Sequence, residues 1–173
     1  MRERADDQRI RALAQRLSVS AASDTTLYLT GGATAVLEGW RRSTVDVDLR
    51  IEPESDELFR ALASAKEALD LNIELASPPD FIPELPGWRE RSPFVLREGR
   101  LTVRHFDPYS QALSKLERGF AQDLEDVEAM VSRGLVDPPR ARELFAAIEA
   151  DLYRYPAIDP GGFQARVEAA LGG

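Results

Sequence analysis

Cysteine is absent from the 173-residue chain, and histidine occurs once, as His105. Without cysteine there is no disulfide, no zinc–thiolate site and no cysteine nucleophile. A single histidine excludes a multi-histidine metal site and disfavours a histidine-based catalytic triad. Only two of the 22 basic residues are lysines, Lys66 and Lys115. Any chemistry is therefore expected to depend on carboxylates, arginines and backbone amides.

Long apolar runs are also missing. No stretch approaches the roughly 18 apolar residues that cross a bilayer, and the first seven residues are mostly charged, unlike a secretory signal. These absences exclude an integral membrane protein and predict a cytoplasmic location. With 30 acidic and 22 basic residues the net charge is −8, which disfavours binding of long DNA. A local basic site for an RNA end or a nucleotide stays compatible with that charge.

The hydrophobic patterns predict alternating helices and strands, followed by helices alone. A composition of 43% hydrophobic and 30% charged residues suits a globular protein of this length. The expected elements are a helix over 4–17, strands over 27–30, 44–52 and 71–75, helices over 33–40 and 55–69, and a hairpin of 94–97 with 101–106. Five of the 11 prolines lie in 77–93, which is predicted to be an irregular covering loop.

The C-terminal third carries a repeated helix-start signal. The dipeptide Asp-Pro occurs at 107–108, 137–138 and 159–160, and it places an N-cap before a proline at the first helical position. We therefore predict an α/β or α+β fold with a small mixed sheet and a C-terminal helical region. The expected division is a core over 1–106 and helices over 107–173, packed as one unit.

The strand expected over 44–52 has the clearest alternation in the chain. Its apolar face comprises Val45, Val47, Leu49 and Ile51, and its polar face comprises Asp46, Asp48, Arg50 and Glu52. The side chains of Asp46 and Asp48 are expected about 6–7 Å apart, where two ionised carboxylates repel by about 2–3 kcal/mol at an effective dielectric of about 20. On a solvated face water screens this repulsion. In a cleft a divalent cation such as Mg²⁺ would compensate it.

A second motif precedes these aspartates. The segment Leu29-Thr30-Gly31-Gly32-Ala33-Thr34 ends a strand and begins a helix. Two glycines let the backbone approach a ligand closely, and backbone N–H groups at a helix start favour the phosphates of a nucleotide. We expect Gly31 and Gly32 to bind phosphate, a side chain at Gly32 to block it, and Thr34 to add a hydroxyl. A tight turn without a ligand is the alternative.

Several arginines extend these possibilities. Arg41 and Arg42 lie between the two motifs, where they would reach a triphosphate or form a surface pair. Five more arginines lie near Trp88, between residues 89 and 104. They form either an RNA-end binding rim with Trp88 as a stacking platform, or an ordinary set of exposed hairpin arginines.

Gly-Gly before a helix, followed by Asp-Val-Asp on the next strand, resembles the signature of the nucleotidyltransferase (polymerase-beta-like) fold. The later segments Tyr109–Arg118 and Gln122–Val127 are similar to those of abortive-infection (AbiEii-type) nucleotidyltransferases of toxin–antitoxin systems. That family carries a lysine on a helix, then a basic residue and an Asp-Leu-x-Asp element. The resemblance covers roughly residues 26 to 131.

The resemblance implies residue roles. Asp46 and Asp48 would hold Mg²⁺ or Mn²⁺, and Gly31 and Gly32 would hold the phosphates. Lys115 would meet the triphosphate or the charge that develops during the reaction. Asp123, in the Asp-Leu-x-Asp element, would join the catalytic set. Many members use a third carboxylate, for which Glu74 is the candidate here, although an exposed partner for an arginine is the alternative.

The resemblance also implies the reaction. A nucleoside monophosphate would pass from a nucleoside triphosphate to tRNA or another RNA, a protein or a small molecule, with a cognate antitoxin or toxin as a further partner. The alternative is a catalytically silent module that binds a nucleotide or a partner. If the helix after Asp107 is continuous, the side chains of Lys115, Arg118, Gln122 and Asp126 share a polar face, which either roofs a cleft or is solvated. A break at Gly119 would change this arrangement.

Overall fold

The computed structural model describes residues 2–172 and divides into two compact units. The first comprises the residues up to Ser77 together with Pro93–His105, and the second comprises Pro78–Ser92 together with the residues from Phe106 onward. The chain passes between the units three times, and the sequence-based boundary after residue 106 lies one residue from the last passage, between His105 and Phe106. Residues 78–92, which belong to the expected irregular covering loop of 77–93, group with the helices of the second unit.

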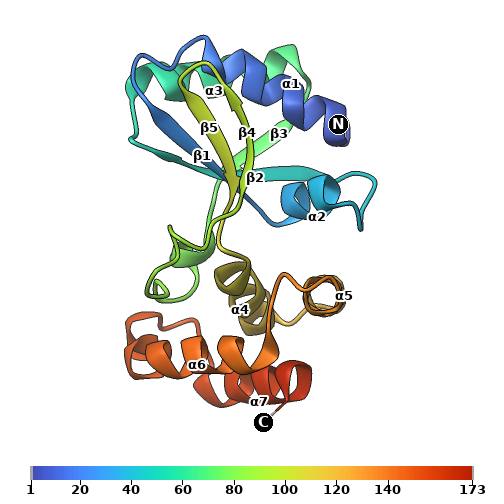
Figure 1. Cartoon of the computed structure of the whole chain (residues 1–173), viewed down its shortest axis with the longest axis vertical. Coiled ribbons are helices and arrows are strands. Elements are labelled where there is room, and N and C mark those ends of the chain that lie inside the picture. The colour runs from blue at the N-terminus through green and yellow to red at the C-terminus, as the bar shows by residue number, and fades with distance from the viewer. Residues whose placement is uncertain (1, 173) are drawn as a thin grey trace. The chain divides into compact units, whose positions relative to one another are not determined.

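The first unit is built on a five-stranded mixed sheet, as expected from the α/β alternation (Figure 1). Its strands are β1 (Thr25–Thr30), β2 (Asp46–Glu52), β3 (Asn72–Leu75), β4 (Phe94–Glu98) and β5 (Leu101–His105). They lie in the order β3-β2-β1-β5-β4. The pairs β1–β2 and β4–β5 are antiparallel, whereas β1–β5 and β2–β3 are parallel.

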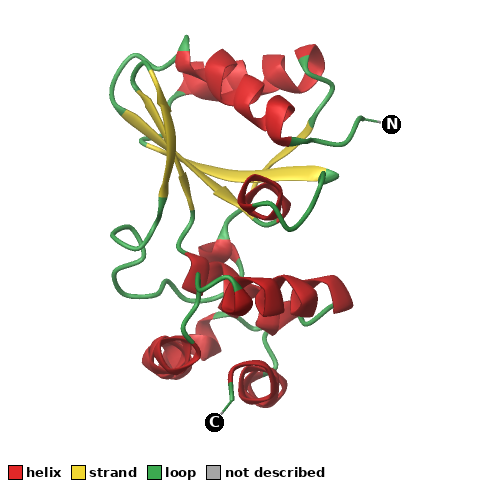
Figure 2. Cartoon of the chain, turned by 45° about the vertical axis from the view of Figure 1, so that its right-hand side comes forward, coloured by secondary structure: helices red, strands yellow, loops and turns green. Residues whose placement is uncertain are grey.

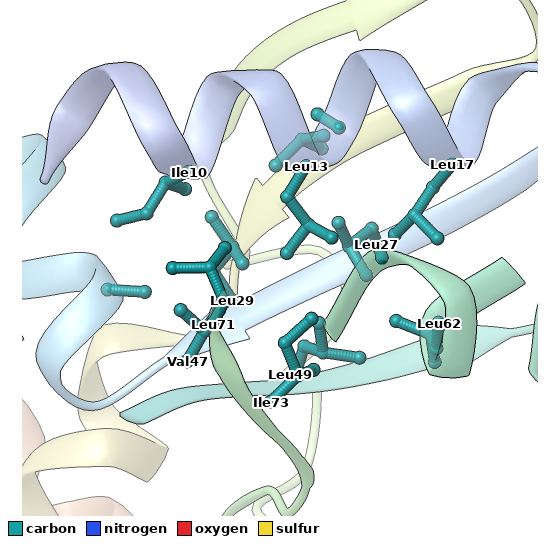
Figure 3. Close-up of a cluster of buried hydrophobic side chains, with 14 of the residues drawn as sticks. Ile10, Leu13, Leu17, Leu27, Leu29, Val47, Leu49, Leu62, Leu71 and Ile73 are labelled. Carbon is teal, nitrogen blue, oxygen red and sulfur yellow. The ribbon is translucent and has the colours of Figure 1, made fainter. Parts of the chain in front are cut away.

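Two helices, α1 (Asp7–Ser18) and α3 (Asp56–Ala68), cover one face of this sheet (Figure 1). Their N-caps are Asp6 and Ser55, whose side chains accept hydrogen bonds from the amides of Arg9 and Leu58. Figure 3 shows leucines and isoleucines of α1 and α3 meeting those of the strands. The labelled core residues are Ile10, Leu13, Leu17, Leu27, Leu29, Val47, Leu49, Leu62, Leu71 and Ile73. This burial of apolar surface stabilises the first unit.

Strand β2 shows the predicted alternation. Val47, Leu49 and Ile51 are buried, whereas the residues between them, Asp46 and Asp48 included, are half-buried on the opposite face. Val45 is the exception, because 56% of it is exposed. The prediction placed it on the apolar face of the strand, but β2 begins at Asp46, so Val45 precedes the hydrogen-bonded residues whose side chains alternate.

The second unit contains helices and loops and, among the described residues, no strand (Figure 2). Its helices are α4 (Pro108–Arg118), α5 (Ala121–Ser132), α6 (Pro138–Ile148) and α7 (Pro160–Leu171), and its short 3-10 segments are η1 (Pro78–Asp80) and η2 (Glu149–Arg154). Asp107, Asp137 and Asp159 are the N-caps of α4, α6 and α7, which confirms the Asp-Pro prediction. Within residues 2–172, no helix combines the length and apolarity that crossing a membrane requires.

The segment after Asp107 is not one continuous helix. Helix α4 ends at Arg118, and Gly119 adopts the left-handed conformation, with φ of 72°, that closes a helix. A Cβ on Gly119 would lie 2.6 Å from Cδ of Arg166, whose guanidinium donates hydrogen bonds to the carbonyls of Leu116 and Glu117. A glycine is therefore required at this corner, and α5 leaves α4 in a new direction.

Candidate nucleotidyl-transfer site

The structure brings the Gly-Gly turn and the aspartate pair together within the first unit. Thr30, the last residue of β1, pairs with Asp48 of β2, and the turn follows directly. Gly31 has φ of +63°, a value that residues with a side chain rarely adopt. A Cβ placed on Gly31 would lie 3.2 Å from Oδ2 of Asp48. The Asp48 carboxylate thus lies against the turn, and both motifs belong to one site.

Strand β3 adds polar groups next to the aspartates. Strand β3 runs parallel to β2, in a register that pairs Glu74 with Asp48 and Asn72 with Asp46. Glu74 is exposed on the same face as Asp48, while the amide of Asn72 donates a hydrogen bond to Oδ1 of Asp46. No group of three histidines, cysteines or acidic residues is arranged to hold a metal ion within residues 2–172.

The donor set nevertheless fits a Mg²⁺ ion shared with substrate. Mg²⁺ prefers oxygen ligands and commonly binds proteins through one or two carboxylates, taking further oxygens from substrate phosphates and water. Asp46 and Asp48 offer two carboxylates on one face of β2, and Glu74 offers a third on the neighbouring strand. The pair alone satisfies that requirement, and Glu74 borders it.

The structure explains the absence of a side chain at Gly32 by packing within the protein. A Cβ at this position would lie 2.0 Å from Oγ1 and 2.6 Å from Cβ of Thr44, a buried residue whose hydroxyl donates to the carbonyl of Asp46. The missing side chain of Gly32 therefore makes room for Thr44. We expected a side chain at Gly32 to occupy the space of the phosphate. In the structure a Cβ at this position would instead overlap Thr44, in the loop before β2.

We expect Gly32→Ala to lower the free energy of unfolding by about 1–3 kcal/mol, because the added methyl overlaps a packed side chain. Thermal and urea denaturation will measure the loss, and the double variant Gly32→Ala/Thr44→Gly should recover part of it. Gly161→Ala is the matched control, since a Cβ there meets no atom closer than 3.8 Å. Equal stability of Gly32→Ala and the wild type would contradict the overlap.

Two arginines follow helix α2 (Gly32–Glu38), and the structure distinguishes them. Nη1 of Arg41 lies 3.1 Å from the Cβ position of Gly32, so its guanidinium is at the turn. Arg42, the sequence-based candidate for nucleotide binding, is exposed. Neighbouring arginines in a loop share the same sequence signal, so only the fold shows which of them faces the turn.

Thr34 is buried inside the first unit. Its Oγ1 lies 3.3 Å from the carbonyl oxygen of Leu29 and 3.0 Å from Nδ1 of His105. Only 1% of Thr34 and 4% of His105 are exposed. Burial lowers the pKa of His105 to about 4, so its ring is neutral at pH 7. The predicted contact of Thr34 with phosphate stays a prediction, and its hydroxyl is engaged in the protein interior.

Lys115 and Asp123 lie in the second unit, at the corner between α4 and α5. Nζ of Lys115 is 2.7 Å from Oδ2 of Asp126 and 4.0 Å from Oδ1 of Asp123. Arg118 contacts both carboxylate oxygens of Asp123, at 2.5 and 2.8 Å. The solvated-face alternative is wrong for Lys115 and Asp126, which are 8% and 2% exposed, whereas Gln122 and much of the Arg118 side chain are exposed. Asp123 is also buried. The catalytic roles of Lys115 and Asp123 stay predictions, and their shown contacts hold the corner together.

The arginine-rich stretch does not offer a stacking platform at Trp88. Trp88 is 3% exposed, and its ring stacks on that of Phe106, with the ring centroids 4.2 Å apart. Arg91 forms an ion pair with the buried Asp107, and Arg97 forms one with Asp24. These contacts favour the structural alternative for this stretch over an RNA-end rim.

Comparison with protein families gives a match over most of the chain. The model of a family described as nucleotidyltransferase of unknown function (DUF6036) matches residues 6–157. That range includes the Gly-Gly turn, the aspartate pair and the corner between α4 and α5. No curated protein and no solved structure matches the chain. The more specific resemblance to AbiEii-type proteins stays a prediction.

Proposed function

Since the chain belongs to this family of nucleotidyltransferases, we propose that it transfers a nucleoside monophosphate from a nucleoside triphosphate to an acceptor, with Mg²⁺ or Mn²⁺ as cofactor. The observation that carries the proposal is the position of Asp48 against the Gly31–Gly32 turn. A metal-binding carboxylate and a phosphate-binding turn must lie side by side if one triphosphate is to meet both.

Different residues of the first unit would bind the metal ion and the phosphates. Asp46 and Asp48 would hold the metal ion, which when bound neutralises phosphate charge and aligns the reacting phosphate. Backbone amides of the turn would hold phosphate oxygens, and Arg41 would add a positive charge there. In the reaction an acceptor hydroxyl oxygen bonds to the α-phosphorus, the bond to the bridging oxygen breaks, pyrophosphate leaves and the hydroxyl proton passes to solvent.

The acceptor and the partners are further parts of the proposal. A tRNA or other RNA, a protein or a small molecule would supply the acceptor hydroxyl, and a cognate antitoxin or toxin would regulate the reaction. A catalytically silent nucleotide-binding module is the second candidate. It is favoured by the pairing of Lys115 with Asp126, because that contact already compensates the lysine charge.

Nucleotide binding is tested by calorimetry. Each of four non-hydrolysable nucleoside triphosphate analogues is titrated into the protein in the presence of Mn²⁺. We expect binding of at least one analogue, and we expect Arg41→Gln to weaken it about tenfold, as loss of one charge-assisted contact would. Arg60→Gln is the matched control, because Arg60 is an exposed arginine on α3. Absence of binding by the folded wild-type chain with all four analogues would refute the proposed function.

A further inference from the structure

The single histidine of the chain connects two elements beside the proposed site. His105 is the last residue of β5 and pairs with Leu29 of β1. Both ring nitrogens have partners on α2: Nδ1 lies 3.0 Å from Oγ1 of Thr34, and Nε2 lies 3.2 Å from Oε1 of Glu38. One buried side chain thus contacts α2 near its start and at its last residue.

Helix α2 depends on such contacts for its position. It has seven residues, Gly32–Glu38, and so short a helix has little stability of its own. Thr34 and Glu38 are four residues apart and therefore lie on one face of the helix, toward His105. The Thr34 hydroxyl also reaches the carbonyl of Leu29, 3.3 Å away, just before the turn. The ends of the Gly31–Gly32 turn are thereby connected to the same imidazole.

The chemistry of the three groups is complementary. The Glu38 carboxylate only accepts hydrogen bonds, so a neutral ring donates from Nε2 and accepts at Nδ1 from the Thr34 hydroxyl, whose single proton is shared between Nδ1 at 3.0 Å and the carbonyl oxygen of Leu29 at 3.3 Å. The ring therefore satisfies a donor and an acceptor that face it from opposite ends of α2. In a His105→Phe variant the ring has a similar size but forms neither hydrogen bond. This variant therefore removes the polar contacts while it keeps most of the packing.

We infer that His105 is a positioning residue for the nucleotidyl-transfer site, which fixes the Gly31–Gly32 turn against Asp48 by binding α2 at Thr34 and Glu38. The inference rests on the proposed function and assigns His105 no contact with substrate. Loss of the two hydrogen bonds would let α2 and its turn shift, and a shift on the order of 1 Å costs up to about a hundredfold when groups must be aligned.

The first test measures the affinity of the full chain for Mn²⁺ with the non-hydrolysable triphosphate that binds best. We expect His105→Phe and Thr34→Val each to weaken binding about tenfold or more, and the double variant to be little worse than either single one. Thr34→Ser keeps the hydroxyl and should weaken binding less than Thr34→Val. Thr25→Val is the matched control: it removes another buried hydroxyl of the first unit, bonded to the carbonyl of Ser23, away from the turn.

A second readout is independent of nucleotide. Amide resonances of Gly31 and Gly32 in the ¹H–¹⁵N spectrum should move in His105→Phe, while those of α1 and α3 change little. Unchanged glycine resonances, or unchanged affinity in a folded His105→Phe or Thr34→Val chain, would overturn the inference. If the wild type binds no nucleotide, the proposed function fails, and the resonances alone decide whether His105 fixes the turn. Should His105→Phe not fold, Thr34→Val and Thr34→Ser give the same comparison.

Discussion

Replacement of Asp48 by asparagine is expected to reduce nucleotidyl transfer about a thousandfold while the fold survives. The side chain is half-buried on the polar face of β2 and lies against the turn, so the change removes charge and adds little volume. A carboxamide binds Mg²⁺ or Mn²⁺ more weakly than a carboxylate, and loss of one electrostatic stabiliser of a transition state alone costs about 10²–10³-fold.

The assay incubates the chain with each of four labelled nucleoside triphosphates, Mg²⁺ or Mn²⁺, and total RNA and protein of a bacterial extract. Label is expected in one class of acceptor. Glu52→Gln is the matched control, because Glu52 lies on the same face of β2, next to Arg50, and four residues beyond Asp48. Transfer that survives Asp48→Asn would remove the carboxylate pair from the mechanism. Nucleotide binding without any transfer would favour the silent module.

Lys115→Met is expected to lower the free energy of unfolding by about 3–5 kcal/mol, the cost of leaving a buried charge without its partner. Asp126 is 2% exposed, and Nζ of Lys115 is 2.7 Å from its carboxylate. Urea denaturation followed by circular dichroism measures the loss. The double variant Lys115→Met/Asp126→Leu should recover most of it, because both charges are then gone.

This pair of variants also separates structure from chemistry. Arg140→Gln is the control for an exposed ion pair, since 49% of the Arg140 side chain and 67% of that of its partner Glu143 are exposed, and we expect it to cost about 1 kcal/mol or less. If the stable double variant transfers nucleotide at the wild-type rate, Lys115 has no role beyond the corner between α4 and α5. If it is stable and inactive, the lysine acts in the reaction. A Lys115→Met chain as stable as the wild type would contradict the buried pair.

Much of the fold could be predicted because its signals act over a few residues. The Asp-Pro dipeptides start three helices at the expected positions, and alternation along β2 places Asp46 and Asp48 on one face. Val45 was wrongly assigned to the apolar face of the strand, because the alternation in the sequence already begins before Asp46, the first residue of β2. The grouping of residues 78–92 with the helices follows from packing, for which a proline-rich loop carries no local pattern.

The sequence predicted which types of group form the site, but it did not predict how they are arranged. The sequence by itself determined a mixed sheet, a glycine turn, a carboxylate pair and a helical C-terminal region, since periodicity, capping and backbone freedom are properties of short segments. Only the tertiary structure decided that Thr44 occupies the space beside Gly32, that Arg41 faces the turn and that His105 binds α2. Likewise, it alone paired Lys115 with Asp126 across the corner at Gly119. Each of these contacts joins residues at least four positions apart in the sequence, and packing, unlike local pattern, determines which of them meet.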